Sequence, residues 1–452
     1  MRLRHPTAIA MLLAALSGAS LRPRPAEGKG GPARAAPSGR AELKEPLGSQ
    51  HVAGVHRRSV GEALQLGSAR FPVAISKDRL TVATTPDGPP DRAVSPGTAV
   101  VFVWQDGGPR RTSLRFERAA GETWSCYVAE ARRLKIDDLE ILLLDADADG
   151  LHGEEGEDAW SLVGSGVALP LPARSVVGRR SVEFGPGGPG GADGTVTLAP
   201  LAGSESQLVA LARINSARLS QGLAPVRLDP ELSEACTEHA RYLAANGWSG
   251  YTNPHAQDLG PKGASEAGAR AASRSVISKN PPEASVRQFL HSYYHRLDLL
   301  HPALETIGVN ADPAGIAVID VVGARGIPLP EGAFVEPVTI PADGSTALYL
   351  DAETEMPVDP VPAMGTRGHP LTALFPGDGL PQGLTGRLVR IGGRKEAKET
   401  EVPLLLAAQG DVRDVFGQVP AQPLASPAEY RWDLSWTVEG EPRAASIRFR
   451  TR

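Results

Sequence analysis

The sequence predicts a multidomain protein in which a central α/β domain lies between two β-rich domains. The chain has 452 residues, more than one hydrophobic core normally holds. Strand-like alternation before residue 200 and after residue 323 surrounds a stretch of helical periodicity. Its 50 glycines and 40 prolines, with only 5% aromatic residues, are typical of loop-rich β domains joined by linkers.

Charge and cysteine content limit the classes of partner. A net charge of -5 gives no general attraction to nucleic acid, so we expect no nucleic-acid partner. Cys126 and Cys236 lie too far apart in the sequence for a CxxC motif. A disulfide between them would have to bridge two domains, and the sequence leaves open whether they pair.

The N-terminal residues 1–19 are typical of a signal peptide. Arg2 and Arg4 precede a short apolar run at 8–16, and small residues follow at 17–19. The apolar run is too short to span a bilayer, and no later stretch approaches that length. We therefore expect secretion to the periplasm or medium and a mature chain without an integral membrane segment. Residues 20–68, rich in proline, glycine and alanine, are predicted to form a disordered tether.

Residues 69–200 are predicted to form a β domain. Short apolar runs, FPVAI, TAVVFVWQ, SLRFER, WSCYVAE and LEILLL, are separated by turn residues. The flexible stretch GPGGPGGADG precedes the end of this domain.

An acidic loop follows the LEILLL run. Three aspartates at alternate positions are followed by a glycine that permits a tight turn, a pattern suited to calcium. The twelfth position, where an EF-hand has glutamate, is Gly156, and another acid would have to replace it. The sequence leaves open a calcium loop and a merely solvated acidic turn. The candidate metal ligands are Asp145, Asp147, Asp149, Glu154 and Asp158, with Glu155 as a further replacement acid.

Residues 201–323 are predicted to form the α/β domain. SQLVALARINSARLSQGL has helical periodicity, and a second helix starts at the N-cap Asp229 with Pro230 and ends before Gly247. His239 falls on the apolar stripe of this second helix, so we expect its side chain to face inward. The strands ETIGVNAD and GIAVIDVVG close the segment.

Several motifs in this segment follow one another in a recognisable order. They are Asn215 and Arg218 before Gly222 and Leu223; Ala235, His239 and Leu243; Phe289, Ser292, His295 and Arg296; and Ile307, Gly308 and Val309. From about residue 207 to 323 the chain therefore resembles the CAP superfamily (cysteine-rich secretory proteins, antigen 5, pathogenesis-related 1), or SCP domain, in its secreted bacterial branch.

The resemblance implies an α-β-α sandwich with an open cleft. In this family the cleft often holds two histidines and acids that can take zinc or another divalent metal. By the resemblance, the two cleft histidines correspond to His255 and His295 in this sequence. Glu266 is the nearest acid, although the Gly-Glu-Asn motif that usually supplies it is absent. We include His239 among the cleft candidates, with a satisfied core histidine as the alternative.

The stretch HSYYHRLDLLH offers a second way to arrange histidines. His291 and His295 are four residues apart, the spacing that places two imidazoles on one helix face. Ser292 stands where a zinc-protease helix would carry its general base. Spacing alone leaves open a zinc site and ordinary helix-face histidines. The resemblance implies that His295 occupies the family's fixed position and His291 a variable one.

Residues 324–452 are predicted to form an immunoglobulin-like β-sandwich. YRWDLSWTV alternates apolar and polar residues, and ASIRFRT alternates again after the turn EGEP. A terminal hairpin is the simplest structure for this pattern.

The sequence favours a binding protein over an enzyme. No GxSxG elbow occurs, so we assign no catalytic residue. We expect a secreted bacterial CAP-domain protein that binds a small apolar or cell-envelope ligand in the CAP cleft, with the β domains positioning it. One alternative is a metal-assisted hydrolase using His255, His295 and Glu266. Another is a structural or adhesion protein with the CAP domain as scaffold.

Overall fold

The computed structural model describes most of the chain after residue 57. The described residues are 42–46, 58–76, 79–106, 108–118, 123–185, 195–248, 253–258, 260–311, 315–322, 337–352, 355, 359–361, 366–375, 380–392, 399–408 and 414–452. The predicted signal peptide, most of the predicted tether and the stretch 186–194 lie outside them.

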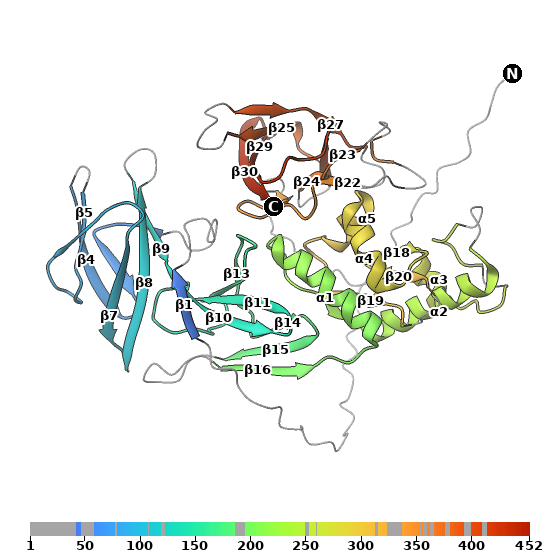
Figure 1. Ribbon diagram of the computed structural model, residues 1–452, viewed down its shortest axis with the longest axis horizontal. Coiled ribbons are helices and arrows are strands. Elements are labelled where there is room, and N and C mark those ends of the chain that lie inside the picture. Colours follow the sequence, from blue (N-terminus) through green and yellow to red (C-terminus); the bar gives the residue numbers. More distant parts are fainter. Residues whose placement is uncertain are drawn as a thin grey trace, which may run out of the picture. The chain divides into compact units, whose positions relative to one another are not determined.

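Within the described residues, two four-stranded sheets form the first β unit, drawn in blue in Figure 1. Phe71, Phe102 and Phe116 lie in the core that these sheets share. In sheet order, one contains β3 (Ala63–Leu66), β4 (Ala69–Ser76), β5 (Arg79–Val82) and β6 (Arg92–Val94), and the other β2 (Arg58–Ser59), β9 (Trp124–Val128), β8 (Pro109–Arg118) and β7 (Ala99–Gln105).

The predicted tether extends too far at its C-terminal end. β1 (Glu42–Pro46), β2 and β3 fall within 20–68, and Val60, Leu64 and Leu66 are buried in the core of the first β unit. The alternation in ALQL is only four residues long, too short to stand out from the surrounding sequence. Pairing with β4 supplies the missing stabilisation.

A second β core follows within the predicted domain 69–200. Leu134, Ile141, Trp160 and Phe184 belong to it. One described sheet has the order β1, β10 (Glu130–Ile136), β11 (Leu139–Leu144), β12 (Ala159–Leu162) and β13 (Leu169–Pro170). The other described sheet has the order β14 (Arg174–Val177), β15 (Arg180–Gly185) and β16 (Thr195–Pro200).

Among its described residues, the central segment contains five helices and a small sheet, coloured green to yellow in Figure 1. The helices are α1 (Glu205–Ser220), α2 (Pro230–Asn246), α3 (Glu266–Ala272), α4 (Pro282–His291) and α5 (Tyr294–Leu299). The sheet order is β17 (Arg227–Leu228), β19 (Thr306–Val309), β20 (Ala317–Asp320) and β18 (Ser275–Ser278).

Local sequence explains the helix ends. A capping box of Ser204 and Gln207 starts α1. Asp229 accepts the amides of Glu231 and Leu232 at the start of α2, which ends at Gly247 with φ of 76°. These N-cap and C-cap positions confirm the predicted bounds of α2.

Helices pack against both sides of this sheet. In β20, Ala317 and Ile319 join a cluster with α1 and α4, whereas Val318 between them joins a cluster with α2 and α3. Successive strand residues point to opposite faces, so the two clusters lie on opposite sides of the strand.

Asn215 and Arg218 fix α1 to the surrounding loops. The Asn215 side chain donates to the Val226 carbonyl and accepts from its amide. The buried Arg218 guanidinium donates to the carbonyls of Ala224, Leu299, His301 and Leu304. A buried polar side chain requires such partners, so these hydrogen bonds allow Asn215 and Arg218 to lie inside the protein.

The part of the C-terminal segment that the structure describes contains two four-stranded sheets with a shared core. One has the order β21 (Val338–Ile340), β24 (Leu371–Leu374), β28 (Val415–Pro420) and β27 (Leu404–Leu406). The other has the order β26 (Thr400–Val402), β25 (Gln382–Ile391), β29 (Ala428–Val438) and β30 (Glu441–Thr451), and β22 (Asp351–Ala352) pairs separately with β23 (Arg367–Gly368).

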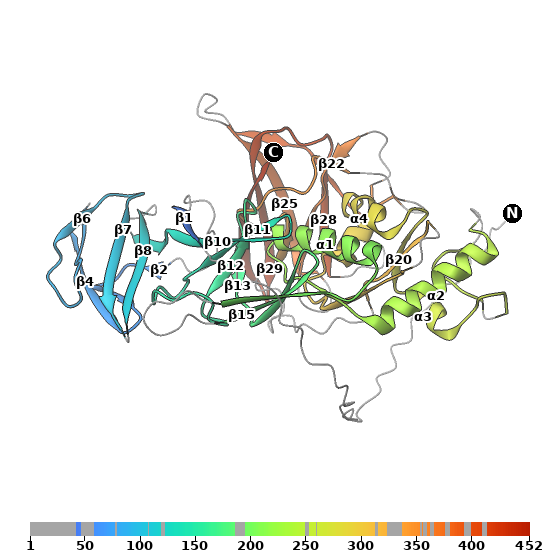
Figure 2. The same cartoon turned by 60° about the horizontal axis from the view of Figure 1, so that its bottom comes forward.

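The predicted terminal hairpin is confirmed. β29 and β30 pair antiparallel from Val438 and Glu441 outward, and Figure 2 shows β25 and β29 in this red part of the chain. Tyr430, Trp432, Leu434 and Trp436 are buried, as the alternation predicts.

The structure also bears on the pairing of the two cysteines and on membrane-spanning helices. Cys126 and Cys236 are both buried and free. Within the described residues, no helix combines the length and apolar character needed to cross a bilayer.

Candidate functional site

The HSYYHR segment, residues 291–296, is interrupted between its histidines. α4 ends at His291 and α5 begins at Tyr294, with Ser292 in an extended conformation between them. His291 and His295 therefore belong to different helices and do not share one helix face. His291 Nε2 lies 2.8 Å from Asp351 Oδ1, and its ring lies 4.5 Å from that of Tyr349.

His295 contacts a carboxylate from beyond the central segment. Its Nδ1 lies 2.7 Å from Glu355 Oε1 and 3.2 Å from Ser292 Oγ, and its ring stacks on Phe289. The His295 side chain is 25% exposed and that of Glu355 only 3%. An imidazole held at Nδ1 by a buried carboxylate has a fixed orientation and tautomer.

Glu355 also caps α5. Its carboxylate accepts the amides of Tyr293, Tyr294 and His295, the unpaired donors at the start of this helix. Burial opposes ionisation of Glu355, but hydrogen bonds from the His295 ring and the Tyr294 amide outweigh it and lower the pKa. Glu355 is therefore a carboxylate at neutral pH.

The rest of the HSYYHR segment docks onto the C-terminal sheets. Arg296 is fully buried and donates to His369 Nε2 at 2.9 Å and to the Pro370 carbonyl at 2.8 Å. The Tyr294 hydroxyl donates to the Ala408 carbonyl. Tyr293 lies so close to Gly417 that a Cβ there would be 1.9 Å from the tyrosine oxygen.

The other predicted cleft residues lie on α2, α3 and the loop between them. His239 is buried, with Nδ1 2.9 Å from Gln257 Oε1 and Nε2 2.7 Å from the Pro254 carbonyl. His255 is exposed. Desolvation lowers its pKa, and the nearby His295 and His239 add to this effect. Glu266 is exposed in the first turn of α3.

The described residues form no three-ligand metal group in the central segment. Both groups of three acidic, histidine or cysteine side chains with ligand atoms within 4.8 Å of one another lie in the loop 145–157. His255, Glu266 and His295 are not brought together as such a group. The acid beside His295 is Glu355.

Glu355 could not be predicted from the sequence, because it lies 60 positions after His295, outside the stretch that carries the family motifs. Its neighbours in DAETEMPVD give it no pattern that separates a buried acid from a solvated one. Only the tertiary contact with the start of α5 identifies it.

A groove lined by both apolar and polar side chains lies on α1 and α4. Its volume is about 510 Å³. Ala217, Val286 and Leu290 line it together with Leu348 and Tyr349 of the C-terminal segment. The exposed Arg213 and Arg287 also line the groove, and Arg213 donates to the Glu283 carbonyl. Such a groove can take an apolar body with a negatively charged end.

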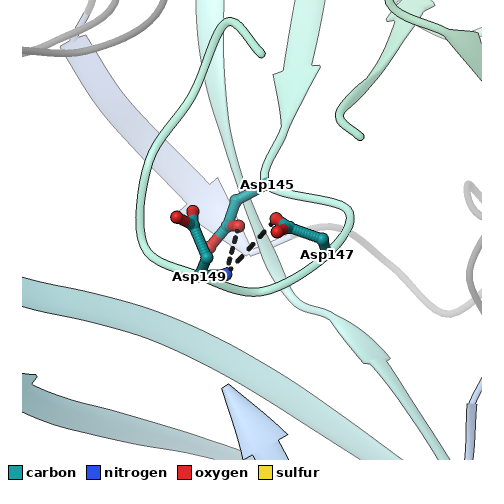
Figure 3. A group of neighbouring side chains, drawn as sticks. All are labelled: Asp145, Asp147 and Asp149. Atoms are coloured by element: carbon teal, nitrogen blue, oxygen red, sulfur yellow. Dashed lines mark hydrogen bonds between the residues drawn. The ribbon is translucent and has the colours of Figure 1, made fainter. Parts of the chain in front are cut away.

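The acidic loop brings most of its predicted ligands together. Asp145, Asp147 and Asp149 form one group (Figure 3), and Asp147, Glu154 and Glu157 the other. Asp158 is buried, and its carboxylate accepts the amides of Ala146, Gly153 and Glu154. Burial raises the Asp158 pKa to about 7. Glu155 is exposed and belongs to neither group.

The central segment is an α/β module, because helices cover both sides of its sheet. A histidine and a carboxylate lie at the start of its short helix α5. Residues 211–315 match the family model of the cysteine-rich secretory protein family, CAP. The chain therefore contains a CAP domain, as the sequence motifs predicted. The flanking parts of the chain lie outside this match.

The comparisons with curated proteins and with solved structures identify no further relative that supports a fold or a function. No curated protein matches the chain. Among solved structures, PcoC, a copper resistance protein from Escherichia coli, is 14% identical, with 19% of this chain and 85% of that chain covered. The TM-score is 0.16, so this likeness carries no argument about fold or function.

Proposed function

We propose that the chain is a secreted bacterial CAP-domain protein that binds a small apolar ligand, with an anionic end, in the groove on α1 and α4. The CAP domain would be an α-β-α sandwich, and the C-terminal segment an immunoglobulin-like module. Residues 1–19 would direct the chain to the periplasm or medium. The flanking β domains would position the CAP domain.

The groove is the observation that carries this proposal. Its lining includes the buried apolar side chains of Val286 and Leu290. Arg287 is exposed at the same groove, and within the described residues no hydrogen bond or ion pair engages it. Apolar contact would supply binding energy, and the guanidinium would favour an anionic group at one end.

The histidine site bears on the alternative of a metal-assisted hydrolase. His295 is held by Glu355, and His239 has an oxygen beside each ring nitrogen. These contacts occupy both ring nitrogens of His239 but only Nδ1 of His295, and the described part of the CAP domain contains no group of three metal-ligating side chains. We therefore do not propose the metal-assisted hydrolase.

A structural role is the second candidate function. Residues 291–296 contact the C-terminal segment through His291, Tyr293, Tyr294, His295 and Arg296. In a purely structural or adhesion protein the CAP domain would act as a scaffold fixed by these contacts, and the groove would bind nothing.

Probe binding separates the two functions. The anionic fluorophore 1-anilinonaphthalene-8-sulfonate should bind the full chain saturably, and Arg287→Glu should weaken its affinity about tenfold by placing a negative charge at the groove. Arg270→Glu, on the exposed side of α3, is the matched control and should bind as the unmodified protein does. Equal affinities for all three proteins, or no saturable binding, would favour the scaffold.

A further inference from the structure

We propose that His369 makes the groove on α1 and α4 sensitive to acid. While its imidazole is neutral, it links the groove wall, which is Leu348 and Tyr349, to Arg296 of α5, and protonation of the ring favours opening of this wall. The inference rests on the proposed function, because it concerns the regulation of the same groove.

A buried arginine and a buried histidine share one hydrogen bond. Arg296 and His369 are both 0% exposed, and Arg296 Nη1 lies 2.9 Å from His369 Nε2. A guanidinium can only donate, so Nε2 must accept, and the neutral ring carries its own proton on Nδ1. A protonated ring has no lone pair at Nε2 and cannot keep this hydrogen bond.

Protonation would also place two positive charges side by side in the interior. Burial lowers the pKa of Arg296 to about 10, so the guanidinium stays charged at neutral and acid pH. Its further partners, the Pro370 carbonyl and Thr372 Oγ1, are uncharged. Burial and then the charge of Arg296 hold the pKa of His369 well below 6.5. The fold therefore excludes a proton from this ring.

The carboxylates near this pair already bind other groups. They are Asp351 with His291 of α4, Glu355 with His295 and the amides at the start of α5, and Asp359 with Arg367 of β23. Within the described residues, none of these carboxylates hydrogen bonds to His369. Charge on His291 disfavours protonation of His369 further, and the Asp351 backbone, which favours it, is the weakest influence on the His369 pKa. Tyr293 beside Arg296 stays neutral, because burial raises its pKa.

His369 is tied directly to the groove wall. Its amide donates to the Leu350 carbonyl, and β23, just before His369, pairs with β22, just after Leu350. The His369 ring lies 6.0 Å from the ring of Tyr349. Leu348 and Tyr349 line the groove together with residues of α1 and α4. Loss of the hydrogen bond to Arg296 therefore loosens the segment that carries this wall.

The pH range follows from the two states of the ring. When the wall opens, His369 reaches water and its pKa returns to about 6.5, whereas the closed form keeps the lower pKa. The closed form is therefore fully favoured above about pH 6.5 and loses this advantage as the pH falls below that value. The opening equilibrium should rise up to about tenfold per pH unit, or about thirtyfold at about pH 5.

Hydrogen exchange of the full chain measures this opening. After correction for intrinsic rates, the amides of β22, β23 and residue 369 should lose protection by about thirtyfold between about pH 6.5 and pH 5. Amides of β8, in the first β unit, serve as the internal reference.

Matched variants assign the effect to one ring. His369→Gln offers Arg296 an acceptor oxygen that does not titrate in this range, so it should remove most of the acid-induced loss of protection. His301→Gln is the control, because His301 is half-buried and does not line the groove, and it should keep the full loss. Circular dichroism at neutral pH checks folding. If His369→Gln does not fold, histidine-selective NMR of the unmodified chain decides, since a His369 ring that is protonated at about pH 6.5 would overturn the proposal.

The results for opening and for probe binding are independent. Equal loss of protection in the unmodified chain and in folded His369→Gln would overturn the role of His369, whatever 1-anilinonaphthalene-8-sulfonate shows at neutral pH. A loss confined to the unmodified and His301→Gln proteins would support it. Absence of saturable probe binding at neutral pH would then count against the proposed function of the groove and leave the acid-sensitive contact standing.

Discussion

His295 has a partner that its sequence context does not reveal. The carboxylate of Glu355 binds the imidazole and three backbone amides at the start of α5. A carboxylate with four donors is well satisfied despite burial, and its removal leaves those donors unpaired. The first expected contribution of the His295–Glu355 pair is therefore to the stability of the fold.

The lowered pKa of Glu355 makes this stabilisation depend on pH. Ionised Glu355 stabilises the fold above its unfolded pKa of about 4.3, and the contribution is lost as the pH falls through the lower folded pKa. Glu355→Gln should reduce the free energy of unfolding by about 1–3 kcal/mol at neutral pH and weaken its dependence on pH below about 4.3.

Urea denaturation across the acidic pH range measures both effects. Glu441→Gln, at an exposed glutamate of β30, is the control and should leave the curve within about 0.5 kcal/mol of the unmodified protein. If Glu355→Gln matched this control at every pH, the buried pair would contribute nothing to stability.

At the scale of elements, α5 depends on close packing against β28. Gly417 in β28 allows Tyr293 to approach, because a Cβ there would lie 1.9 Å from the tyrosine oxygen and 2.6 Å from its ring. Gly417→Ala should therefore destabilise the chain by about 3 kcal/mol or more, since the backbone and the ring must both move.

Thermal unfolding of paired glycine variants tests this contact. Gly260→Ala is the control, because a Cβ there meets nothing within 4 Å. Tyr293→Ala combined with Gly417→Ala should cost less than the sum of the two single changes, since removal of the ring removes the clash. Strict additivity would show that the tyrosine does not limit the space at Gly417.

Local sequence explains which elements were predictable. α2 carries its own start and stop signals at Asp229 and Gly247, and β29 alternates over a long run, so their structures follow from nearby residues. The break between α4 and α5 was not predictable, because the signal for it is distant. Glu355 and Gly417 favour a new helix start at residues 293–295, and both are supplied by later parts of the chain.

The two candidate sites also differ in how far the nearby sequence predicts them. The acidic loop is continuous in sequence, so the convergence of Asp145, Asp147 and Asp149 could be predicted from spacing. The groove on α1 and α4 was not predicted, because none of the predicted cleft residues, His239, His255, Glu266 and His295, lines it. Leu348 and Tyr349 join residues of α1 and α4 only because the C-terminal segment packs there.

At the scale of the whole molecule, the CAP domain is completed by the chain that follows it. The C-terminal segment provides Glu355 at the histidine site and two side chains, Leu348 and Tyr349, at the groove on α1 and α4. Leu348 and Tyr349 pack against the same core cluster as Val286 and Leu290. We therefore expect ligand binding to require the full chain.

The most direct measurement is the displacement of a bound fluorescent fatty-acid analogue by palmitate from the full chain. The proposed function predicts one saturable site that is lost in Ser216→Trp, because Ser216 lines the groove and an indole there would fill it. Ser273→Trp, at an exposed position after α3, should bind as the unmodified protein does. Equal binding by folded Ser216→Trp would contradict the assignment of the ligand to this groove.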